Sequence, residues 1–493
     1  MTIDLSKNTL CYGDNLEVLR LHVPDQCVDL IYLDPPFNSN ATYNILFAEQ
    51  NGKKSRAQIK AFTDTWHWDQ GAEQAYVEVV ETSGRVSDAM QAFRKLLGEN
   101  DMMAYLAMMA PRLKELRRVL KPTGSIYLHC DPTASHYLKL LMDAVFGPEN
   151  FCNEIIWYFK TGGLSKRWFG RKHQTMFFYS RTGQYRFAPQ KEKSYLMHKY
   201  GFSNIEIHKD EDGFYTWVYM RDVWDIPALR GNQPEMLGYP TQKPEALLER
   251  IIRASSNDGD LVLDPFCGCG TTVCAAQRLN RRWIGIDVTH LAVALIKSRL
   301  RDAFGEQETT LKARYDVIGE PKDLEGARQL AKDDRYQFQW WALGLAEARP
   351  VEQKKGADKG IDGRLYFHDE AEGGQTKQIV FSVKAGKTGV AHVRDLRGVV
   401  ERENAAIGVL ISMEEPTRDM RKEAAAAALY ESPFWQKRYP RLQLITVGDL
   451  LEGKRIDAPP RRTSVTFKRA PKARNCDDHE TKEMELGTGR GQE

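Results

Sequence analysis

Residues 261–272 read LVLDPFCGCGTT, and this stretch decides the fold that we expect. Its first residues have the apolar composition of a buried strand, and the glycines that follow indicate a tight turn into a helix. Residues 273–279 continue as a helix, and residues 283–287 form another strand that ends in Asp287. This order predicts a nucleotide-binding βαβ unit, in which glycines let the backbone approach the ligand and the final acid binds ribose hydroxyls.

The turn departs from the dinucleotide-binding pattern in two ways. It lacks the G-x-G-x-x-G spacing, and Asp264 lies at its start, where a pyrophosphate would be repelled. A cationic cofactor fits better beside this acid. Cys267 and Cys269 form a C-x-C pair without a second pair at zinc spacing, so we interpret them as small residues that pack the turn.

A second motif, Asp34-Pro35-Pro36-Phe37, follows the apolar run 28–33, which we interpret as a buried strand. Two consecutive prolines lack backbone N–H groups and cannot extend that strand, so the chain leaves the sheet in a stiff loop. The loop holds a carboxylate, an unpaired carbonyl and an aromatic ring close together. Such a set suits a planar, amine-bearing molecule such as a nucleobase rotated out of a duplex.

Together these motifs resemble those of DNA amino-methyltransferases that use S-adenosylmethionine, over roughly residues 8 to 300. The catalytic motif precedes the cofactor motif, as in the β class, which includes the modification subunits of type III restriction systems. The resemblance implies adenine N6 as the acceptor, because enzymes of the family that modify cytosine N4 more often carry Ser in place of Asp34. A cytosine-N4 enzyme, an RNA amino-methyltransferase and a non-catalytic DNA-binding protein stay open as alternatives. The implied catalytic residues are Asp34, Pro35, Pro36 and Phe37, and the implied cofactor-binding residues are Asp14, Lys243, Asp264, Pro265, Phe266, Gly268, Gly270 and Asp287.

Two of these residues have a second interpretation. Asp14 follows the apolar strand 9–12, and it is either an adenine-contacting acid, as the resemblance implies, or the N-cap of the next helix. Lys243 lies in the TQKP segment 241–244, ahead of a helix over 245–252. The family places a further cofactor segment there, yet a surface lysine would also explain the residue.

Further βα units surround the two motifs. Helices over 105–120 and 135–146 flank a strand over 124–129. His129 and Asp131 lie at the end of this strand, where they are either ligand-facing or structural residues. Residues 38–100 are polar and irregular.

Residues 151 to 240 break this pattern. Two apolar strands, 155–159 and 176–180, enclose a basic, aromatic and glycine-containing loop that suits contact with phosphates and bases, or that is simply solvated. We expect target recognition within residues 160–235.

The C-terminal part has its own α/β pattern. We expect a linker over 301–335, a domain over 336–455 and a disordered tail over 456–493. The domain resembles the restriction-endonuclease-like core, particularly its Mrr-type branch, with Asp362 heading one strand and Lys384 ending the next. In that core carboxylates hold Mg²⁺ and the lysine orients water. Ser382 stands where the family usually has Glu or Gln, so an active nuclease, a DNA-binding relic and an unrelated domain all stay open.

Composition sets the outer limits. The chain has 493 residues, enough for two to four domains, and its 42% hydrophobic and 28% charged residues are ordinary for a globular protein. The net charge of +3 is nearly neutral, so any contact with DNA must come from local patches. No apolar run is long enough for a membrane span, the N-terminus lacks a signal peptide, and the eight cysteines are scattered, which favours reduced thiols in a cytoplasm.

We therefore expect a cytoplasmic α/β protein that acts on double-stranded DNA without a membrane. Its fold should be a doubly wound, Rossmann-like methyltransferase sheet (residues 1–300) with a target-recognition insertion, plus a C-terminal α/β restriction-endonuclease-like domain. S-adenosylmethionine is the expected cofactor, with Mg²⁺ at the C-terminal domain. A restriction subunit or a second copy of the chain is the expected protein partner.

Overall fold

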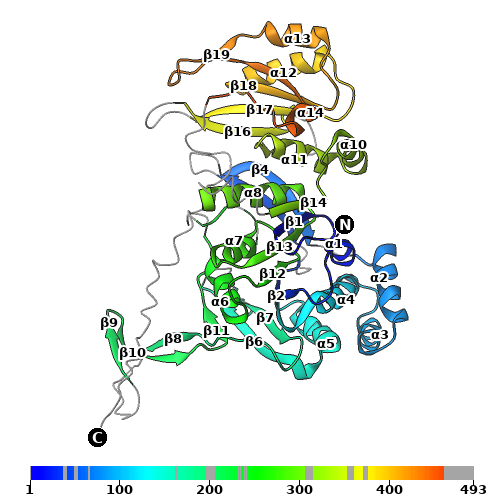
Figure 1. The fold of residues 1–493 in the computed structure, drawn as a ribbon, viewed down its shortest axis with the longest axis vertical. Coiled ribbons are helices and arrows are strands. Elements are labelled where there is room, and N and C mark those ends of the chain that lie inside the picture. Colours follow the sequence, from blue (N-terminus) through cyan, green and yellow to red (C-terminus); the bar gives the residue numbers. More distant parts are fainter. Residues whose placement is uncertain are drawn as a thin grey trace.

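The computed structural model of the protein describes most of the chain (Figure 1). Three of its segments, 41–48, 54–64 and residue 368, are described by their backbone alone. Phe37 and the tail from residue 460 lie outside the described residues. The described ranges are 2–36, 41–48, 54–64, 67–160, 165–195, 206–230, 233, 235–237, 239, 241–305, 315–351, 360–369 and 376–459.

A nine-stranded sheet forms the first and larger domain, in the order β11-β6-β7-β5-β2-β12-β13-β1-β14. All pairs from β5 to β14 are parallel, whereas β7 is antiparallel to both of its neighbours. Parallel strands are covered on both faces, which explains their nearly continuous apolar sequences. The strands are β1 Asn8–Tyr12, β2 Val28–Leu33, β5 Leu120–Cys130, β6 Phe151–Tyr158, β7 His173–Ser180, β11 Val223–Asp225, β12 Leu261–Asp264, β13 Arg282–Asp287 and β14 Tyr315–Ile318.

Helices cover both faces of this sheet, so the predicted doubly wound fold is confirmed. One buried cluster joins the strands to α1 Asn15–His22, α2 Gln70–Glu81, α3 Arg85–Leu97, α4 Asp101–Val119 and α5 Ser135–Phe146. A second cluster, on the other face, joins them to α6 Glu245–Ser255, α7 Thr271–Arg278 and α8 His290–Phe304. A short 3₁₀ helix, η1 Pro148–Asn150, precedes β6.

Three segments differ from the predictions. Residues 38–100, which we expected to be irregular, contain the hairpin β3 Ala41–Ala48 with β4 Lys54–Asp64 as well as α2 and α3. The expected linker contains β14, which pairs with β1 and extends the main sheet. β6 and β7, expected to flank or lie within the target-recognition insertion, also belong to that sheet.

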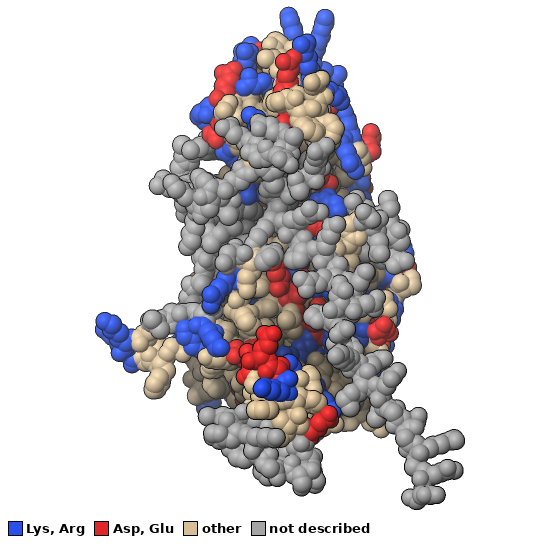
Figure 2. All heavy atoms as spheres, turned by 90° about the vertical axis from the view of Figure 1, so that its left-hand side faces the viewer, with Lys and Arg blue, Asp and Glu red and all other residues tan. Residues whose placement is uncertain are grey.

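The part of the insertion that leaves the domain is a small antiparallel sheet, which projects from the body (Figure 1). Its strands are β8 Lys191–Tyr195, β9 His208–Asp210 and β10 Gly213–Tyr219. Trp217 is 45% exposed and Tyr219 is 69% exposed, so this sheet presents aromatic rings to solvent. Figure 2 shows separate groups of Lys and Arg over this side of the molecule with acidic groups among them, consistent with the nearly neutral net charge.

The C-terminal domain, which here comprises residues 324–459, is built on a five-stranded sheet in the order β15-β16-β17-β18-β21. On one face lie α10 Leu324–Asp333, α11 Arg335–Leu345 and α14 Val447–Leu451, and on the other lie α12 Val390–Arg402 and α13 Arg418–Ala425. The strands are β15 Arg349–Pro350, β16 Gly363–His368, β17 Thr376–Lys384, β18 Ile407–Ser412 and β21 Leu442–Thr446, with a separate pair β19 Leu429–Glu431 and β20 Arg438–Pro440. None of the described helices has the length and apolar composition that a bilayer-spanning helix needs.

Candidate active site

Four aspartates follow four neighbouring strands at one edge of the main sheet. Asp34 comes directly after β2, Asp264 ends β12, Asp287 ends β13, and Asp14 lies two residues after β1. These strands are adjacent and parallel, in the order β2-β12-β13-β1, so their carboxyl ends point the same way. The carboxyl edge is where open α/β sheets bind ligands. The topology thus brings together acids that lie more than 200 residues apart in the sequence.

A single cavity of about 440 Å³ opens at this edge. Both motifs contribute to its wall, so the Asp34 loop and the glycine-rich turn share one site. Gly270 is not part of the wall, and Phe37 lies outside the described residues. The predicted residues that line the cavity are Asp14, Asp34, Pro35, Pro36, Lys243, Asp264, Pro265, Phe266, Gly268 and Asp287.

Lys243 forms an ion pair with the acid of the proline motif. Its Nζ donates to Asp34 Oδ2 and also, at 3.2 Å, to the carbonyl oxygen of Thr241. Lys243 is only 7% exposed, so its interpretation as a surface lysine is wrong. A buried, charge-assisted pair of this kind fixes one of the two Asp34 oxygens.

His129 lies directly beneath Asp34. Its Nδ1 is 4.0 Å from Asp34 Oδ1 and 2.8 Å from the hydroxyl of Tyr32. Burial holds the pKa of His129 well below its usual value and raises the pKa of Tyr32, so both groups are neutral near pH 7. Asp131, by contrast, accepts from the backbone N–H of Thr133 at 2.9 Å, and neither His129 nor Asp131 is among the residues that line the cavity. Of these two strand-end residues, His129 supports the site and Asp131 caps a turn.

The glycine-rich turn depends on backbone conformations that other residues rarely adopt. Gly268 and Gly270 have φ values of +49° and +75°, and a Cβ on Gly270 would lie 2.8 Å from Ile296 Cγ1. Asp287, at the end of β13, holds this turn through hydrogen bonds to its carboxylate. Its Oδ2 accepts from the N–H of Gly268 at 3.0 Å, and its Oδ1 accepts from the N–H and the hydroxyl of Thr289, both at 2.9 Å. Asp287 also lines the cavity, where ligand hydroxyls could approach its carboxylate.

Asp14 fulfils the N-cap interpretation and also faces the cavity. Its Oδ1 accepts from the N–H of Leu16 at 2.8 Å, which caps α1. Its Oδ2 accepts from Arg112 Nη2 at 2.5 Å. The side chain is therefore held by α1 and α4 at the rim of the cavity, and the two interpretations of this residue do not exclude each other.

The electrostatics of the cavity favour a cationic ligand. Burial raises the pKa of Asp264 to about 7, with a further contribution from Asp34 and Asp287, and burial raises the pKa of Asp287 to about 6. Their ionised forms are thus disfavoured in a low-dielectric, acid-rich site. A positive charge placed among these carboxylates would relieve this cost. The carboxylates of Asp264 and Asp287 therefore suit a molecule that carries both a positive charge and hydroxyl groups.

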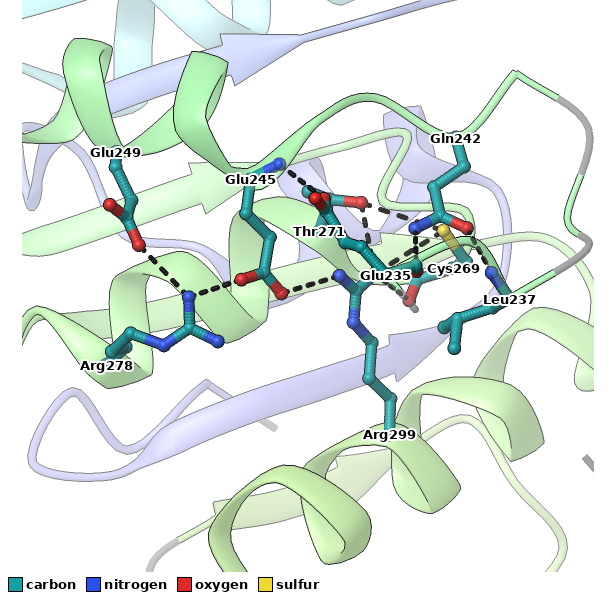
Figure 3. A network of polar contacts seen from close by, with 9 residues as sticks. All are labelled: Glu235, Leu237, Gln242, Glu245, Glu249, Cys269, Thr271, Arg278 and Arg299. Carbon is teal, nitrogen blue, oxygen red and sulfur yellow. Dashed lines mark hydrogen bonds and ion pairs between the residues drawn. The ribbon is translucent and has the colours of Figure 1, made fainter. Parts of the chain in front are cut away.

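Sequence reasoning missed a buried polar network behind the turn (Figure 3). Arg299 of α8, 2% exposed, donates to Glu245 Oε1 at 2.8 Å, to Thr271 Oγ1 at 3.0 Å and to the carbonyl oxygen of Cys269 at 3.2 Å. Glu245 is the first residue of α6 and follows Lys243 by two positions, and it also accepts from Arg278 of α7. The network thus fixes the glycine-rich turn to the segment that carries Lys243. The available signal was an arginine in the largely apolar helix sequence 291–300, although Lys297 and Ser298 lie beside it.

The two residues predicted for the C-terminal site do lie together. Lys384 Nζ is 3.6 Å from Asp362 Oδ2, across β16 and β17. Protein donors surround this carboxylate, however: the N–H of Val383 at 2.7 Å, the hydroxyl of Ser382 at 3.4 Å and the side-chain amide of Gln339 at 3.4 Å. Within the described ranges, no group of three or more His, Cys, Asp or Glu side chains could hold a metal ion. The expected Mg²⁺ site is therefore not supported.

Comparisons with known proteins agree with this division of the chain. Residues 28–298 match the family model of the N6/N4 DNA methylases, and residues 343–452 match that of a NACHT-associated inactive restriction endonuclease. The second family is described as inactive, which agrees with an Asp362 carboxylate that is hydrogen-bonded and ion-paired within its own domain.

Two curated relatives are similar to the chain. The type II methyltransferase M.HpaI of Haemophilus parainfluenzae is 32% identical over 205 residues, which are 41% of this chain and 60% of that protein. The type II methyltransferase M.BglII of Bacillus subtilis is 27% identical over 390 residues, 76% of this chain and 87% of that protein. The chain thus spans less than two thirds of M.HpaI and most of M.BglII.

Solved structures of low identity also resemble the chain. The cytosine-N4-specific PvuII DNA methyltransferase is 17% identical, with a TM-score of 0.38 over 64% of this chain and 95% of that one. The complex of M1.HpyAVI with SAM is 17% identical, with a TM-score of 0.33 over 59% and 98%. The family match over residues 28–298 covers more than half of the sequence, and this chain therefore belongs to the N6/N4 DNA methylase family.

Proposed function

We propose that this chain transfers a methyl group from S-adenosylmethionine to N6 of adenine in double-stranded DNA. The observation that carries the proposal is the shared cavity, whose wall includes both the Asp34-Pro35-Pro36 loop and the turn that begins at Asp264. An acceptor amine on the first element and a methyl donor on the second would be close enough to react there. The family's description as DNA methylases gives the class of reaction.

The residues of the cavity fit the proposed cofactor. Asp264 and Asp287, whose pKa values are raised, offer negative charge to a cationic molecule. Asp287 lies on the cavity wall at the end of its strand, where ribose hydroxyls would approach it, and the glycine at position 268 exposes backbone on that wall. When bound, the cofactor supplies an electrophilic methyl group on a sulfonium sulfur. All of these groups come from β12, β13 and the turn between them.

The proline motif would act on the acceptor. An aromatic amine is a weak nucleophile, because its lone pair is delocalised into the ring. Asp34 and the carbonyl oxygen of Pro35 would accept hydrogen bonds from that amine and stabilise the positive charge that develops on it. Lys243 donates to Oδ2 of Asp34 and His129 lies 4.0 Å from Oδ1, so these two neighbours orient the carboxylate that the amine would meet. Phe37, outside the described residues, is retained as the proposed stacking partner of the flipped base.

The choice of base and the biological setting extend this proposal. Adenine N6 is proposed because the motif begins with Asp34 rather than Ser. The projecting sheet β8-β10-β9 would read the target, since exposed rings such as Trp217 and Tyr219 can stack on bases or lie against the backbone. We further propose that the enzyme works within a restriction–modification system, together with a restriction subunit or a second copy of the chain.

Asp34→Ala tests the central assignment. With tritiated S-adenosylmethionine and duplex DNA, we expect wild-type label in N6-methyladenine after nucleoside digestion, and none for Asp34→Ala, while calorimetry shows cofactor affinity within a few-fold of wild type. Asp88→Ala, an exposed acid on α3, is the matched control and should behave like wild type. Full activity of Asp34→Ala would refute the catalytic role of the Asp34 loop. Label in N4-methylcytosine or in RNA alone would refute adenine N6 of DNA as the acceptor.

A further inference from the structure

The C-terminal domain reaches into the cofactor cavity of the methylase domain. Of the described residues that line this cavity, Gln337 alone comes from the C-terminal domain. It lies in the first turn of α11, whose neighbouring residues Phe338 and Trp341 are buried in the core of that domain. Figure 1 shows α11 between the C-terminal sheet and α8. A domain that matches an inactive endonuclease thus supplies one side chain to the site of another reaction.

Gln337 is held by a specific contact with the cofactor-side loop. Its Oε1 accepts from the backbone N–H of His290 at 3.0 Å. His290 is the first residue of α8 and follows Asp287 by three positions, and Val288 and Thr289 between them also line the cavity. Because the first N–H groups of a helix have no partner inside the helix, this bond from outside fixes the loop that carries Asp287.

The contact is part of a continuous helix–helix interface. α11 and α8 run in the same direction: Gln337 meets His290, Gly344 meets Ala294, and Glu347, just after α11, meets Arg301.

Glycine favours the close approach in the middle of this contact, because a Cβ on Gly344 would lie 3.3 Å from Ala294 Cβ, which is a tight carbon–carbon distance. At the other end of the interface, Arg301 Nη1 lies 2.8 Å from Glu347 Oε1 in an ion pair. Three contacts along two packed helices hold the domains in one register, so Gln337 is not an incidental surface residue.

We infer that Gln337 is a positioning residue of the cofactor site, through which the C-terminal domain holds the Asp287 loop in its binding conformation. This inference rests on the proposed function, because it assumes that S-adenosylmethionine binds in the cavity. Gln337 acts through His290, and it need not touch the cofactor. By linkage, cofactor binding also stabilises the docking of α11 against α8.

Calorimetric titration of the full chain with S-adenosylmethionine tests the inference. Gln337→Ala should weaken cofactor binding about 2- to 10-fold, the usual effect of losing one hydrogen bond. Gln337→Glu keeps an acceptor for the His290 N–H and adds a carboxylate near a cationic ligand, so it should bind at least as tightly as wild type. Tyr336→Ala, on the exposed side of the same turn, is the matched control and should not differ from wild type.

Hydrogen exchange of the cofactor-free chain gives a second readout that does not depend on S-adenosylmethionine. The His290 amide should exchange faster in Gln337→Ala than in wild type, and Gln337→Glu should restore its protection. Wild-type affinity in Gln337→Ala would overturn the inference, and so would equal losses in Ala and Glu, which would mean a direct contact instead. If the wild-type chain binds no S-adenosylmethionine, the proposed function fails, and unchanged His290 exchange in Gln337→Ala would then overturn the positioning role separately.

Discussion

Binding of S-adenosylmethionine should become tighter as the pH rises from 6 to 8. The pKa of Asp264 is raised to about 7 and that of Asp287 to about 6, so the free protein carries protons on these side chains in this range. A cationic ligand favours the ionised carboxylates, so binding must release those protons. Raising the pH removes them beforehand, which increases the affinity, and above pH 8 this gain ends because both groups are already ionised.

The size of the effect follows from the two pKa values. At pH 6 about one in eleven Asp264 side chains and half of the Asp287 side chains are ionised, so about one molecule in twenty carries both charges. At pH 8 about nine in ten molecules do. If the complex requires both charges, the affinity is about 20-fold higher at pH 8 than at pH 6, and binding at pH 7 releases about 0.6 protons.

Calorimetry in pairs of buffers with different ionisation enthalpies measures both the affinity and the released protons. Asp264→Asn should bind more weakly and should show only about a 2-fold change between pH 6 and 8, which is the share of Asp287. The cofactor's own amino group also titrates, with an ordinary pKa of about 7.7–8.0, and the comparison with Asp264→Asn cancels its contribution. An affinity that is constant over this range, or that falls as the pH rises, would refute the reasoning.

Three substitutions test the frame around the site. Gly270→Ala would place a Cβ 2.8 Å from a side-chain carbon of α8 at a φ of +75°, and we expect a loss of about 1–3 kcal/mol in the free energy of unfolding, measured by urea denaturation. Arg299→Met removes one cation from the buried Glu245, and we expect a loss near the lower end of about 3–5 kcal/mol, because Arg278 remains; wild-type stability would contradict the importance of the network. Lys243→Met should lower the rate of methyl transfer at least about 10-fold while changing cofactor affinity less, since a buried carboxylate without its cation takes up a proton more readily; equal losses in rate and affinity would instead place this lysine at the cofactor.

The sequence predicted those parts of the site that depend on local backbone chemistry. A run of apolar residues, then Asp264 and two glycines with positive φ, specifies a strand and a turn without reference to the rest of the chain. The same holds for Asp34 and its two prolines, which end β2 for steric reasons. Because both segments follow parallel strands, their meeting at one edge followed from the fold class alone.

Contacts between distant side chains were beyond such reasoning. Lys243 and Asp34 are 209 residues apart, and nothing in the polar TQKP segment distinguishes a buried lysine from an exposed one. Edge strands gave equally weak signals. β14 is short and only partly buried, with the sequence YDVI, so it carries neither the apolar run of a central strand nor a long alternation. Its place beside β1 depends on pairing with a strand more than 300 residues earlier.

Ser382 takes the place of the second carboxylate that the expected metal site would use. A carboxylate at this position would place a second negative charge close to Asp362, and two such charges are stable in a buried site only with a cation between them. The serine hydroxyl instead lies 3.4 Å from Asp362 Oδ2, beside the N–H of Val383, and Lys384 supplies the countercharge. The Asp362 carboxylate is thus paired within its own domain, and α11 of that domain carries the contact with His290 on which the inferred positioning role rests.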